Sequence, residues 1–410
     1  MNLVRAAWVL PISGPPVARG WVAVRDGAIV AAGGPGEAPP PGVVRETDLG
    51  EAAVLPGLVN AHTHLELSWL RGRVPPAPAF TGWIRQLFAA RGGAIERPDD
   101  PRVLAETLTA AREARASGTA LVGDVSNSLA SVAPIGEAGL SGLVFHELLG
   151  FAATDGAPIA AGAAARQAAA PPAGVRVTIA PHAPYSVSAE LFQAIRAAVD
   201  RSAVPITTVH LGESPEEVEM LATGTGPWPA MLKWIGAWRE GWTAPGVGPV
   251  EYLDGLGVLD ARTLVVHGVQ LGAASLARLA EIGATVVTCP RSNQWVGVGV
   301  PPVAAFYAAG LDVAVGTDSL ASVDDLNLFS ELAAMRWLAP DVPARRLLES
   351  ATRTGAAALG FGDTHGTIEP GKQADLIAVR VPAAVPDVEA HLVSGIQPRD
   401  ITWVSDQITR

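Results

Sequence analysis

Short apolar runs alternate with longer stretches rich in Ala, Leu and Arg through the middle of the chain. The apolar runs contain many β-branched residues, which favour strands, and the longer stretches have the composition of helices. A strand followed by a helix, repeated eight times over roughly 300 residues, predicts an α/β fold of the (β/α)8 TIM barrel type. The eight runs are residues 54–59, 119–125, 142–148, 175–180, 204–209, 263–266, 285–288 and 313–315.

The two ends of the chain have a different pattern. Residues 20–33 read as two short strands around Asp26-Gly27, which predicts a β-hairpin, and residues 372–380 and 401–404 have the same β character. We therefore expect one small β-sandwich domain built from both termini. The expected boundaries are residues 1–56 plus 366–410 for this domain and 57–365 for the barrel.

Composition and charge exclude several classes of protein. The chain has 410 residues, with 29 basic against 40 acidic side chains and a formal net charge of −11. This acidic balance argues against a surface for nucleic acid or anionic membrane, because both need clustered Lys and Arg. Apolar residues make up 49% of the chain, which is ample for a globular core.

Targeting segments and disulfides are not expected. No stretch reaches the ~18 uninterrupted apolar residues of a membrane span, and prolines interrupt the short apolar run near the N-terminus. Cys289 is the one cysteine, so an intramolecular disulfide and a multi-cysteine metal site are both excluded. A reducing compartment suits this composition, and we expect a cytoplasmic protein with no membrane partner.

Histidines gather where the predicted strands end, which in such a barrel is the face that carries the chemistry. His62 and His64 can face one side of the first barrel strand and reach one ion, because strand residues i and i+2 point the same way. The alternative is that these polar residues only make hydrogen bonds within the barrel core. That interpretation does not explain why the opposite ends of the same strands lack such residues. The residues at these ends are His62, His64, His146, His182, His210, His267 and Asp318.

Glu213 stands three residues after His210. A carboxylate just past a metal ligand is placed to exchange protons with the group that a metal-activated water attacks. The alternative is an acid at a helix N-terminus, because Ser214-Pro215 looks like a helix start.

Six segments along the chain carry a joint signal: residues 55–64, 210–213, 266–268, 289–293, 316–319 and 371–376. Together they resemble the amidohydrolase superfamily, in the branch that contains nucleobase deaminases and triazine chlorohydrolases. The resemblance implies a barrel with a small β domain and one divalent metal ion, usually zinc and sometimes iron. Binuclear relatives use a carbamylated lysine after the fourth strand, and neither Lys233 nor Lys372 lies there.

The resemblance also implies a role for each site residue. His62, His64, His210 and Asp318 match the metal ligands. His267 and Asp318 match the residues that orient or deprotonate the metal-bound water, and Glu213 matches the acid that protonates a ring nitrogen. The implied reaction is hydrolytic deamination, in which metal-bound hydroxide attacks an electron-poor ring carbon and ammonia leaves.

Further segments resemble the 6-aminodeoxyfutalosine deaminases of menaquinone biosynthesis, whose substrate is an adenine nucleoside with a 3-carboxyphenyl ketone tail. They include residues 64–68, 72–75, 82–84 and 124–127. His182 matches a residue that contacts the ribose in related deaminases. Glu66 could contact the substrate or support the ligand turn. Arg85 and Arg91 are candidates for binding the carboxylate, although exposed arginines of such a helix are often only solvated.

Other functions stay open at this point. A triazine-type chlorohydrolase or aminohydrolase could use the same metal, as could a deaminase of adenosine, S-adenosylhomocysteine or methylthioadenosine, and a non-catalytic barrel is a third class. The expected partner is a small nucleoside-like molecule, and a homodimer is one option for assembly. Trp234, Trp238 and Trp242, which follow Trp228, are spaced as one helical face and could be a lid or plain packing.

Overall fold

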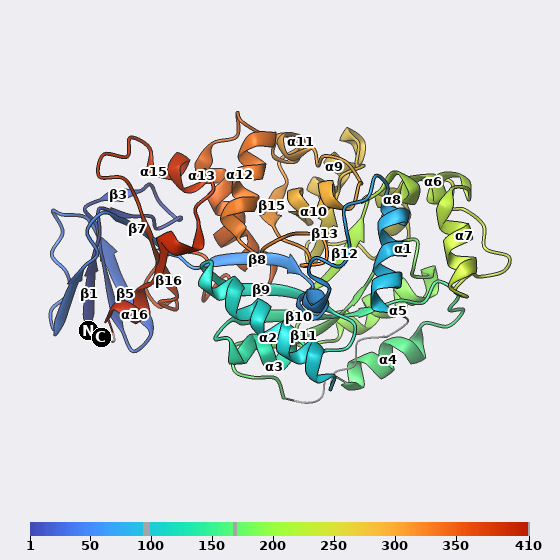
Figure 1. Ribbon diagram of the computed structural model, residues 1–410, viewed down its shortest axis with the longest axis horizontal. Coiled ribbons are helices and arrows are strands. Elements are labelled where there is room, and N and C mark those ends of the chain that lie inside the picture. Colours follow the sequence, from blue (N-terminus) through green and yellow to red (C-terminus); the bar gives the residue numbers. More distant parts are fainter. Residues whose placement is uncertain (93–98, 167–169, 409–410) are drawn as a thin grey trace.

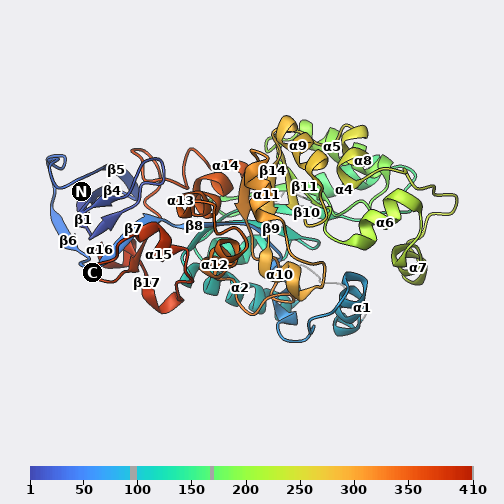
Figure 2. The same ribbon diagram turned by 90° about the horizontal axis from the view of Figure 1, so that it is seen from above.

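The computed structural model describes residues 1–92, 99–166 and 170–408, and it contains a (β/α)8 barrel with a small β-sandwich domain at one end (Figures 1 and 2). The barrel strands form two parallel four-stranded sheets that follow the chain order. The strands are β8 (Leu58–Thr63), β9 (Thr119–Ser126), β10 (Ser141–Leu148), β11 (Val175–Pro181), β12 (Thr207–Leu211), β13 (Thr263–His267), β14 (Thr285–Thr288) and β15 (Asp312–Val315).

The two half-sheets are joined at the carboxyl ends of their outer strands. The carbonyl oxygen of His62 accepts hydrogen bonds from the backbone nitrogens of Thr317 and Asp318, each at 3.1 Å. At the other seam, the backbone nitrogen of His210 donates to the carbonyl oxygen of His182 at 2.9 Å. Both seams therefore lie beside the residues that the sequence marks as functional.

Helices follow each barrel strand and cover the outside of the barrel (Figure 1). The first half of the barrel carries η1 (Leu65–Leu70), α1 (Phe80–Arg91), α2 (Pro101–Ala116), α3 (Val132–Glu137), α4 (Ala157–Arg166) and α5 (Ala189–Asp200). The second half carries α6 (Pro215–Thr223), α7 (Pro227–Trp234), α8 (Pro249–Gly255), α9 (Ala273–Ile282), α10 (Pro290–Trp295), α11 (Val303–Ala308), α12 (Leu328–Leu338), α13 (Ala344–Glu349), η2 (Ser350–Thr354) and α14 (Gly355–Ala358).

The small domain packs two sheets face to face and holds both termini (Figures 1 and 2). The predicted hairpin is confirmed, with Asp26 and Gly27 at φ 52° and 76°, the left-handed pair that a tight hairpin turn requires. The elements are β1 (Asn2–Arg5), β2 (Trp8–Val9), β3 (Val17–Ala18), β4 (Trp21–Arg25), β5 (Ala28–Gly33), β6 (Arg45–Asp48), β7 (Ala52–Pro56), β16 (Leu376–Arg380), α15 (Val388–Leu392), η3 (Pro398–Asp400), β17 (Ile401–Trp403) and α16 (Val404–Ile408).

The first predicted strand is in fact two strands. β7 pairs with β16 in the small domain, β8 begins the barrel, and Gly57 separates them. A Cβ atom at Gly57 would lie 2.5 Å from the Cβ of Ala120, so only glycine fits this close crossing between the domains. The fifth predicted strand also starts later than expected, at Thr207.

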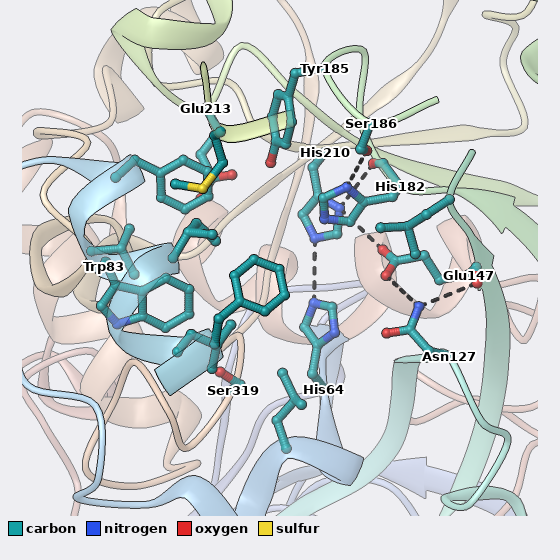
Figure 3. Close-up of a pocket in the computed structure, with 18 of the residues that line it drawn as sticks. His64, Trp83, Asn127, Glu147, His182, Tyr185, Ser186, His210, Glu213 and Ser319 are labelled. Atoms are coloured by element: carbon teal, nitrogen blue, oxygen red, sulfur yellow. Dashed lines mark hydrogen bonds and ion pairs between the residues drawn. The ribbon is translucent and has the colours of Figure 1, made fainter. Parts of the chain in front are cut away.

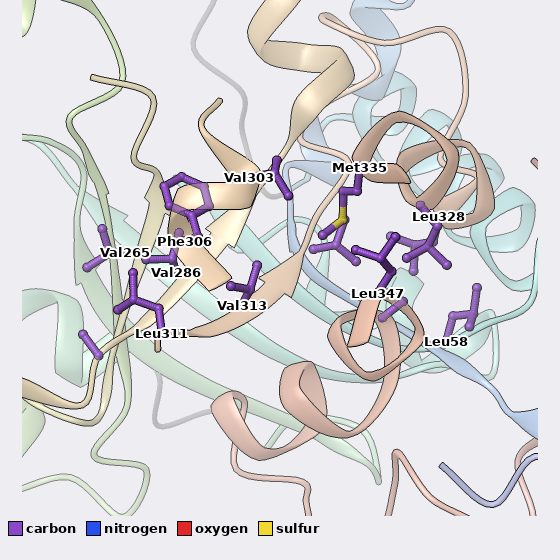
Figure 4. Packing of buried hydrophobic residues seen from close by; sticks show 14 of the residues in the cluster. Leu58, Val265, Val286, Val303, Phe306, Leu311, Val313, Leu328, Met335 and Leu347 are labelled. Atoms are coloured by element: carbon purple, nitrogen blue, oxygen red, sulfur yellow. The ribbon is translucent and has the colours of Figure 1, made fainter. Parts of the chain in front are cut away.

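Both faces of the barrel strands are buried, which explains why their sequences read as continuous apolar runs. Along β13, Leu264 and Val266 belong to the cluster inside the barrel, whereas Val265 packs outward. The outward cluster includes Val286, Phe306 and other residues between strands and helices (Figure 4). Alternate residues of each strand therefore hold the barrel interior and the helical layer.

The expected tryptophan face on one helix is wrong. Helix α7 ends at Trp234, because Gly236 and Gly241 adopt left-handed φ values of 73° and 77° that stop a helix. Trp238 and Trp242 instead pack against Phe151, with ring centroids 5.8 and 5.4 Å away.

Within the described residues, no helix has the length and apolar character needed to cross a membrane.

Candidate active site

Four side chains converge at the carboxyl ends of three barrel strands. His62 lies near the end of β8 and His64 directly follows this strand, His210 lies near the end of β12, and Asp318 follows β15. The Nε2 atoms of His64 and His210 are 3.4 Å apart, and Oδ1 of Asp318 lies 3.7 Å from Nε2 of His64 and 3.9 Å from Nε2 of His62. Atoms bonded at about 2.0–2.2 Å to one tetrahedral zinc ion are separated by similar distances.

The chemistry of these groups fits a divalent metal ion. Burial lowers the pKa of His62 well below 6.5, the pKa of His64 to about 3 and that of His210 to about 4. The imidazoles are therefore neutral, which is the form that binds metals. Both ring nitrogens of His62 are buried without a hydrogen-bond partner among the described residues, and an ion would supply the missing contact.

Neighbouring groups orient the convergent side chains. Ser292 donates to Oδ2 of Asp318 at 2.6 Å, and the backbone nitrogen of Ser319 donates to Oδ1 at 2.8 Å. Nδ1 of His210 lies 3.1 Å from the carbonyl oxygen of His182, which turns Nε2 toward the cluster. Such partners fix the ring or carboxylate geometry that a metal site needs.

His267 and Glu213 form a second pair beside this cluster. Nε2 of His267 lies 3.5 Å from Oε1 of Glu213, and Nδ1 shares a hydrogen bond of 3.0 Å with the amide of Asn293. His267 and Asp318 both have left-handed backbone, at φ 75° and 61°. Such a conformation costs energy in residues other than glycine, and it is typical of functional sites.

Hydrogen bonds to the side chain of Glu217 fix the segment that carries Glu213. The carboxylate of Glu217 accepts hydrogen bonds from the backbone nitrogens of Gly212 and Glu213, both at 3.0 Å. Ser214 caps α6 by accepting from the backbone nitrogen of Glu217 at 3.2 Å, so the expected helix start is confirmed. Burial, followed by the charge of Asp318, raises the pKa of Glu213 well above 4.5, which favours the protonated form of its carboxyl group.

His64, His210, Glu213, His267 and Asp318 line one cavity that opens to solvent. Figure 3 shows His64, His182, His210, Glu147 and Asn127 along one side of it and Trp83 on the opposite side. The apolar side comes largely from α1 and α7, so a polar face and an aromatic face oppose one another. Its main apolar residues are Phe80, Trp83, Leu87, Tyr185, Trp228 and Met231.

The other residues predicted to bind the substrate differ in whether they line the cavity. His182 lines the cavity, and its Nδ1 shares a hydrogen bond of 2.5 Å with Ser186. Arg91 also lines the cavity, whereas Arg85 lies outside the lining and its guanidinium stands 6.0 Å from the ring of Trp234. Glu66 is buried outside the lining.

Glu66 ties the turn after the metal-ligand motif to the end of β9. Its carboxylate accepts from the hydroxyls of Ser126 and Ser128, each at 2.6 Å, and from the backbone nitrogen of Asn127 at 2.6 Å. These contacts favour the supporting role over contact with the substrate.

Sequence reasoning missed Glu147 as part of the site, and it included Asn127 and Asn293 only within matching segments, without a role. The predicted end of the third strand drew attention to His146, but strand alternation turns Glu147 into the cavity and His146 away from it. Burial raises the pKa of Glu147 to about 6. The signal available was a carboxylate near the end of an otherwise apolar run, at the same level as the histidines.

Comparisons with known proteins agree with this geometry. Residues 53–404 match the family described as Amidohydrolase family. A 5-methylthioadenosine/S-adenosylhomocysteine deaminase of Moorella thermoacetica is 32% identical, over 98% of this chain and 92% of the relative. An aminodeoxyfutalosine deaminase of Deinococcus radiodurans is also 32% identical, over 75% of this chain and 74% of the relative.

A solved structure extends the similarity to three dimensions. An adenosine deaminase of Xanthomonas campestris with bound zinc superposes with a TM-score of 0.81 at 29% identity, covering 98% of this chain and 90% of that chain. The shared fold therefore spans the barrel and the small domain together.

Proposed function

The chain belongs to the amidohydrolase family, and we propose that it is a metal-dependent deaminase of adenine nucleosides, with 6-aminodeoxyfutalosine as the favoured substrate. The observation that carries the proposal is that Glu213 lines the same cavity as His64, His210 and Asp318. A proton donor beside a metal-type cluster suits hydrolysis of an exocyclic amine on a nitrogen-containing ring.

His62, His64, His210 and Asp318 would hold the ion, and zinc suits their nitrogen and oxygen donors. When bound, the ion would lower the pKa of water toward neutrality and so supply a nucleophile. Zinc is also present in the similar Xanthomonas structure, which supports the choice of metal.

The proton transfers fall to this chain's own residues. Asp318 and His267 would accept the proton that water gives up, because both face the cluster. Glu213 would donate its carboxyl proton to the ring nitrogen next to the attacked carbon. Asp318 and His267 would pass the proton taken from water to the amino group, which leaves as ammonia, and Glu213 would recover its proton from the new hydroxyl group as this becomes a carbonyl. Its raised pKa suits this donation, since a general acid must hold its proton at the working pH.

The outer part of the cavity supports a nucleoside with a substituent at the 5′ position. Arg91 lines the cavity at the end of α1, three residues after Phe88, an aromatic residue of the same lining. An aryl carboxylate would pack its ring against Phe88 and pair its charge with the guanidinium. On this basis the enzyme would serve menaquinone biosynthesis.

A second candidate substrate is 5′-methylthioadenosine. Leu87, Phe88 and Ile235 also line the cavity, and an apolar thioether would fit among them. The similarity to the deaminase of Moorella thermoacetica supports this candidate.

Ammonia release from adenine nucleosides and chloride release from atrazine test the proposal. The zinc-loaded protein would be assayed with 6-aminodeoxyfutalosine, 5′-methylthioadenosine, S-adenosylhomocysteine, adenosine and atrazine. We expect deamination of the adenine nucleosides, with the highest kcat/KM for 6-aminodeoxyfutalosine. Higher kcat/KM for 5′-methylthioadenosine would select the second candidate, and turnover of atrazine alone would refute nucleoside deamination.

A further inference from the structure

Glu147 is a buried carboxylate in the cavity that the proposed chemistry does not use. It lies at the end of β10, is 6% exposed and lines the cavity beside His182 and His210 (Figure 3). The other carboxylates among the described lining residues, Glu213 and Asp318, already have roles in proton transfer and metal binding. Glu147 is therefore available for the substrate.

Its protein partners leave part of its hydrogen-bonding capacity unused. Nδ2 of Asn127 donates to Oε2 at 2.9 Å. Nδ1 of His210 is 3.5 Å from Oε1, but it lies closer to the carbonyl oxygen of His182, at 3.1 Å. Because a carboxylate offers about four acceptor positions, at least two can still serve a ligand.

The position of Glu147 beside His182 indicates what kind of ligand would fill its unused acceptor positions. Glu147, His182 and His210 each offer an oxygen or nitrogen atom within 4.8 Å of the others. This spacing suits a ligand with two adjacent hydroxyl groups, each of which can donate to a carboxylate oxygen while accepting from a neighbouring donor. Adenine itself has no such pair of hydroxyls, but the ribose of a ribonucleoside has one.

We propose that Glu147 binds the 2′,3′-diol of the nucleoside ribose and makes the enzyme select ribonucleosides over 2′-deoxyribonucleosides. This inference rests on the proposed nucleoside deaminase function and adds a specificity-determining residue to it. Asn127 holds the carboxylate in place through its hydrogen bond to Oε2. A 2′-deoxynucleoside leaves one of the buried acceptor positions unpaired, which penalises its binding.

The test compares ribose and 2′-deoxyribose substrates in wild-type, Glu147→Gln and Glu147→Ala enzymes. The substrates are adenosine, 5′-methylthioadenosine and their 2′-deoxy counterparts, with zinc content measured for every preparation. We expect wild type to favour each ribonucleoside by about tenfold or more in kcat/KM, because a buried hydrogen bond to a charged group is lost otherwise. In the variants this preference should fall by about tenfold, mainly through weaker turnover of the ribonucleosides.

Glu349→Gln is the matched control. Glu349 is also a buried carboxylate, but it pairs with Arg353 at 3.1 Å and does not line the cavity. This control should keep the wild-type ratio. Binding of inosine and 2′-deoxyinosine, followed by tryptophan fluorescence because Trp83 and Trp228 line the cavity, gives a readout independent of turnover.

Equal losses on ribose and 2′-deoxyribose substrates, or loss of zinc from the Glu147 variants, would overturn the proposal and assign Glu147 to support of His210. Failure of the nucleoside deaminase function itself would look different. In that case wild type would release no ammonia from any adenine nucleoside, whereas failure of the Glu147 proposal leaves ammonia release intact and the ratio unchanged.

Discussion

Nε2 of His267 lies 3.5 Å from Oε1 of Glu213, although the two residues come from different strand–loop segments of the barrel. His267 is the last residue of β13, and Glu213 follows the neighbouring strand β12. Adjacent parallel strands therefore bring the proposed proton acceptor and the proposed proton donor together. A substrate ring bound between them would contact both side chains.

Glu213→Gln should keep the fold and the metal but lower kcat by about 10²–10⁴-fold, because an amide cannot donate and recover a proton. Steady-state kinetics with metal content measured in parallel would check this. Glu216→Gln, an acid of the same helix start outside the cavity lining, serves as control and should retain normal kcat. Near-normal turnover by Glu213→Gln would remove Glu213 from the mechanism.

Purified protein should bind one divalent ion per chain through His62, His64, His210 and Asp318. Removal of the ion by a chelator should abolish turnover and lower the melting temperature, since a ligand bound only to the folded state stabilises it by about 2.7 kcal/mol at 100 times its Kd. Elemental analysis and thermal unfolding with and without added zinc would measure both effects. Two equivalents of metal, or an unchanged melting temperature, would contradict the single site.

Asp124 should make stability fall as the pH rises. Burial raises its pKa from 3.8 to about 8, so between these values the folded state keeps a proton that the unfolded state releases. The contribution of Asp124 to the free energy of unfolding is fully present below about pH 4. It then falls by up to about 1.4 kcal/mol per pH unit as the pH rises to about 8.

The neutral variant Asp124→Asn should remove this slope, since its amide oxygen can still accept from the backbone nitrogen of Leu65, which lies 2.8 Å from Oδ1. Urea unfolding at pH 5.5, 6.5 and 7.5 would compare the two proteins. Asp312→Asn, at an exposed position on β15, should follow the wild-type slope. Parallel pH dependence for wild type and Asp124→Asn would show that Asp124 ionises freely in the folded protein.

The barrel and its family were predictable from sequence because they depend on long-range repetition. Alternating apolar runs and helical stretches predict eight strands, and histidines at strand ends mark the face that carries the site. Strand limits were less certain, since an apolar run does not reveal where the chain leaves one sheet for another. Gly57 is such a point, and only its close approach to Ala120 explains it.

Side-chain direction was the harder part of the site. A shift of one residue in the phase of a strand exchanges its two faces, so the sequence could not distinguish His146 from Glu147 as the cavity residue. The spacing of the tryptophans likewise suggested one helix. Residue spacing gives no information on the left-handed backbone of Gly236, so the end of the helix could not be predicted. The metal, acid-base and substrate roles of the site residues stay predictions that the experiments described here address.

The last prediction concerns the carboxylate of the favoured substrate and separates two arginines on one helix. Arg91 lines the cavity at the end of α1, whereas Arg85 stands near the ring of Trp234. Arg91→Met should therefore lower kcat/KM for 6-aminodeoxyfutalosine by about tenfold or more, because a charge-assisted pair is lost.

Kinetics of both variants on substrates with and without a carboxylate would check this. Arg91→Met should leave 5′-methylthioadenosine, which has no carboxylate, within about twofold of wild type, since no charge pair is lost there. Arg85→Met, the matched control from the same helix, should change neither substrate. Equal losses on both substrates with Arg91→Met would assign the arginine to the structure of α1, and a selective loss with Arg85→Met would assign the carboxylate to Arg85, outside the described cavity lining.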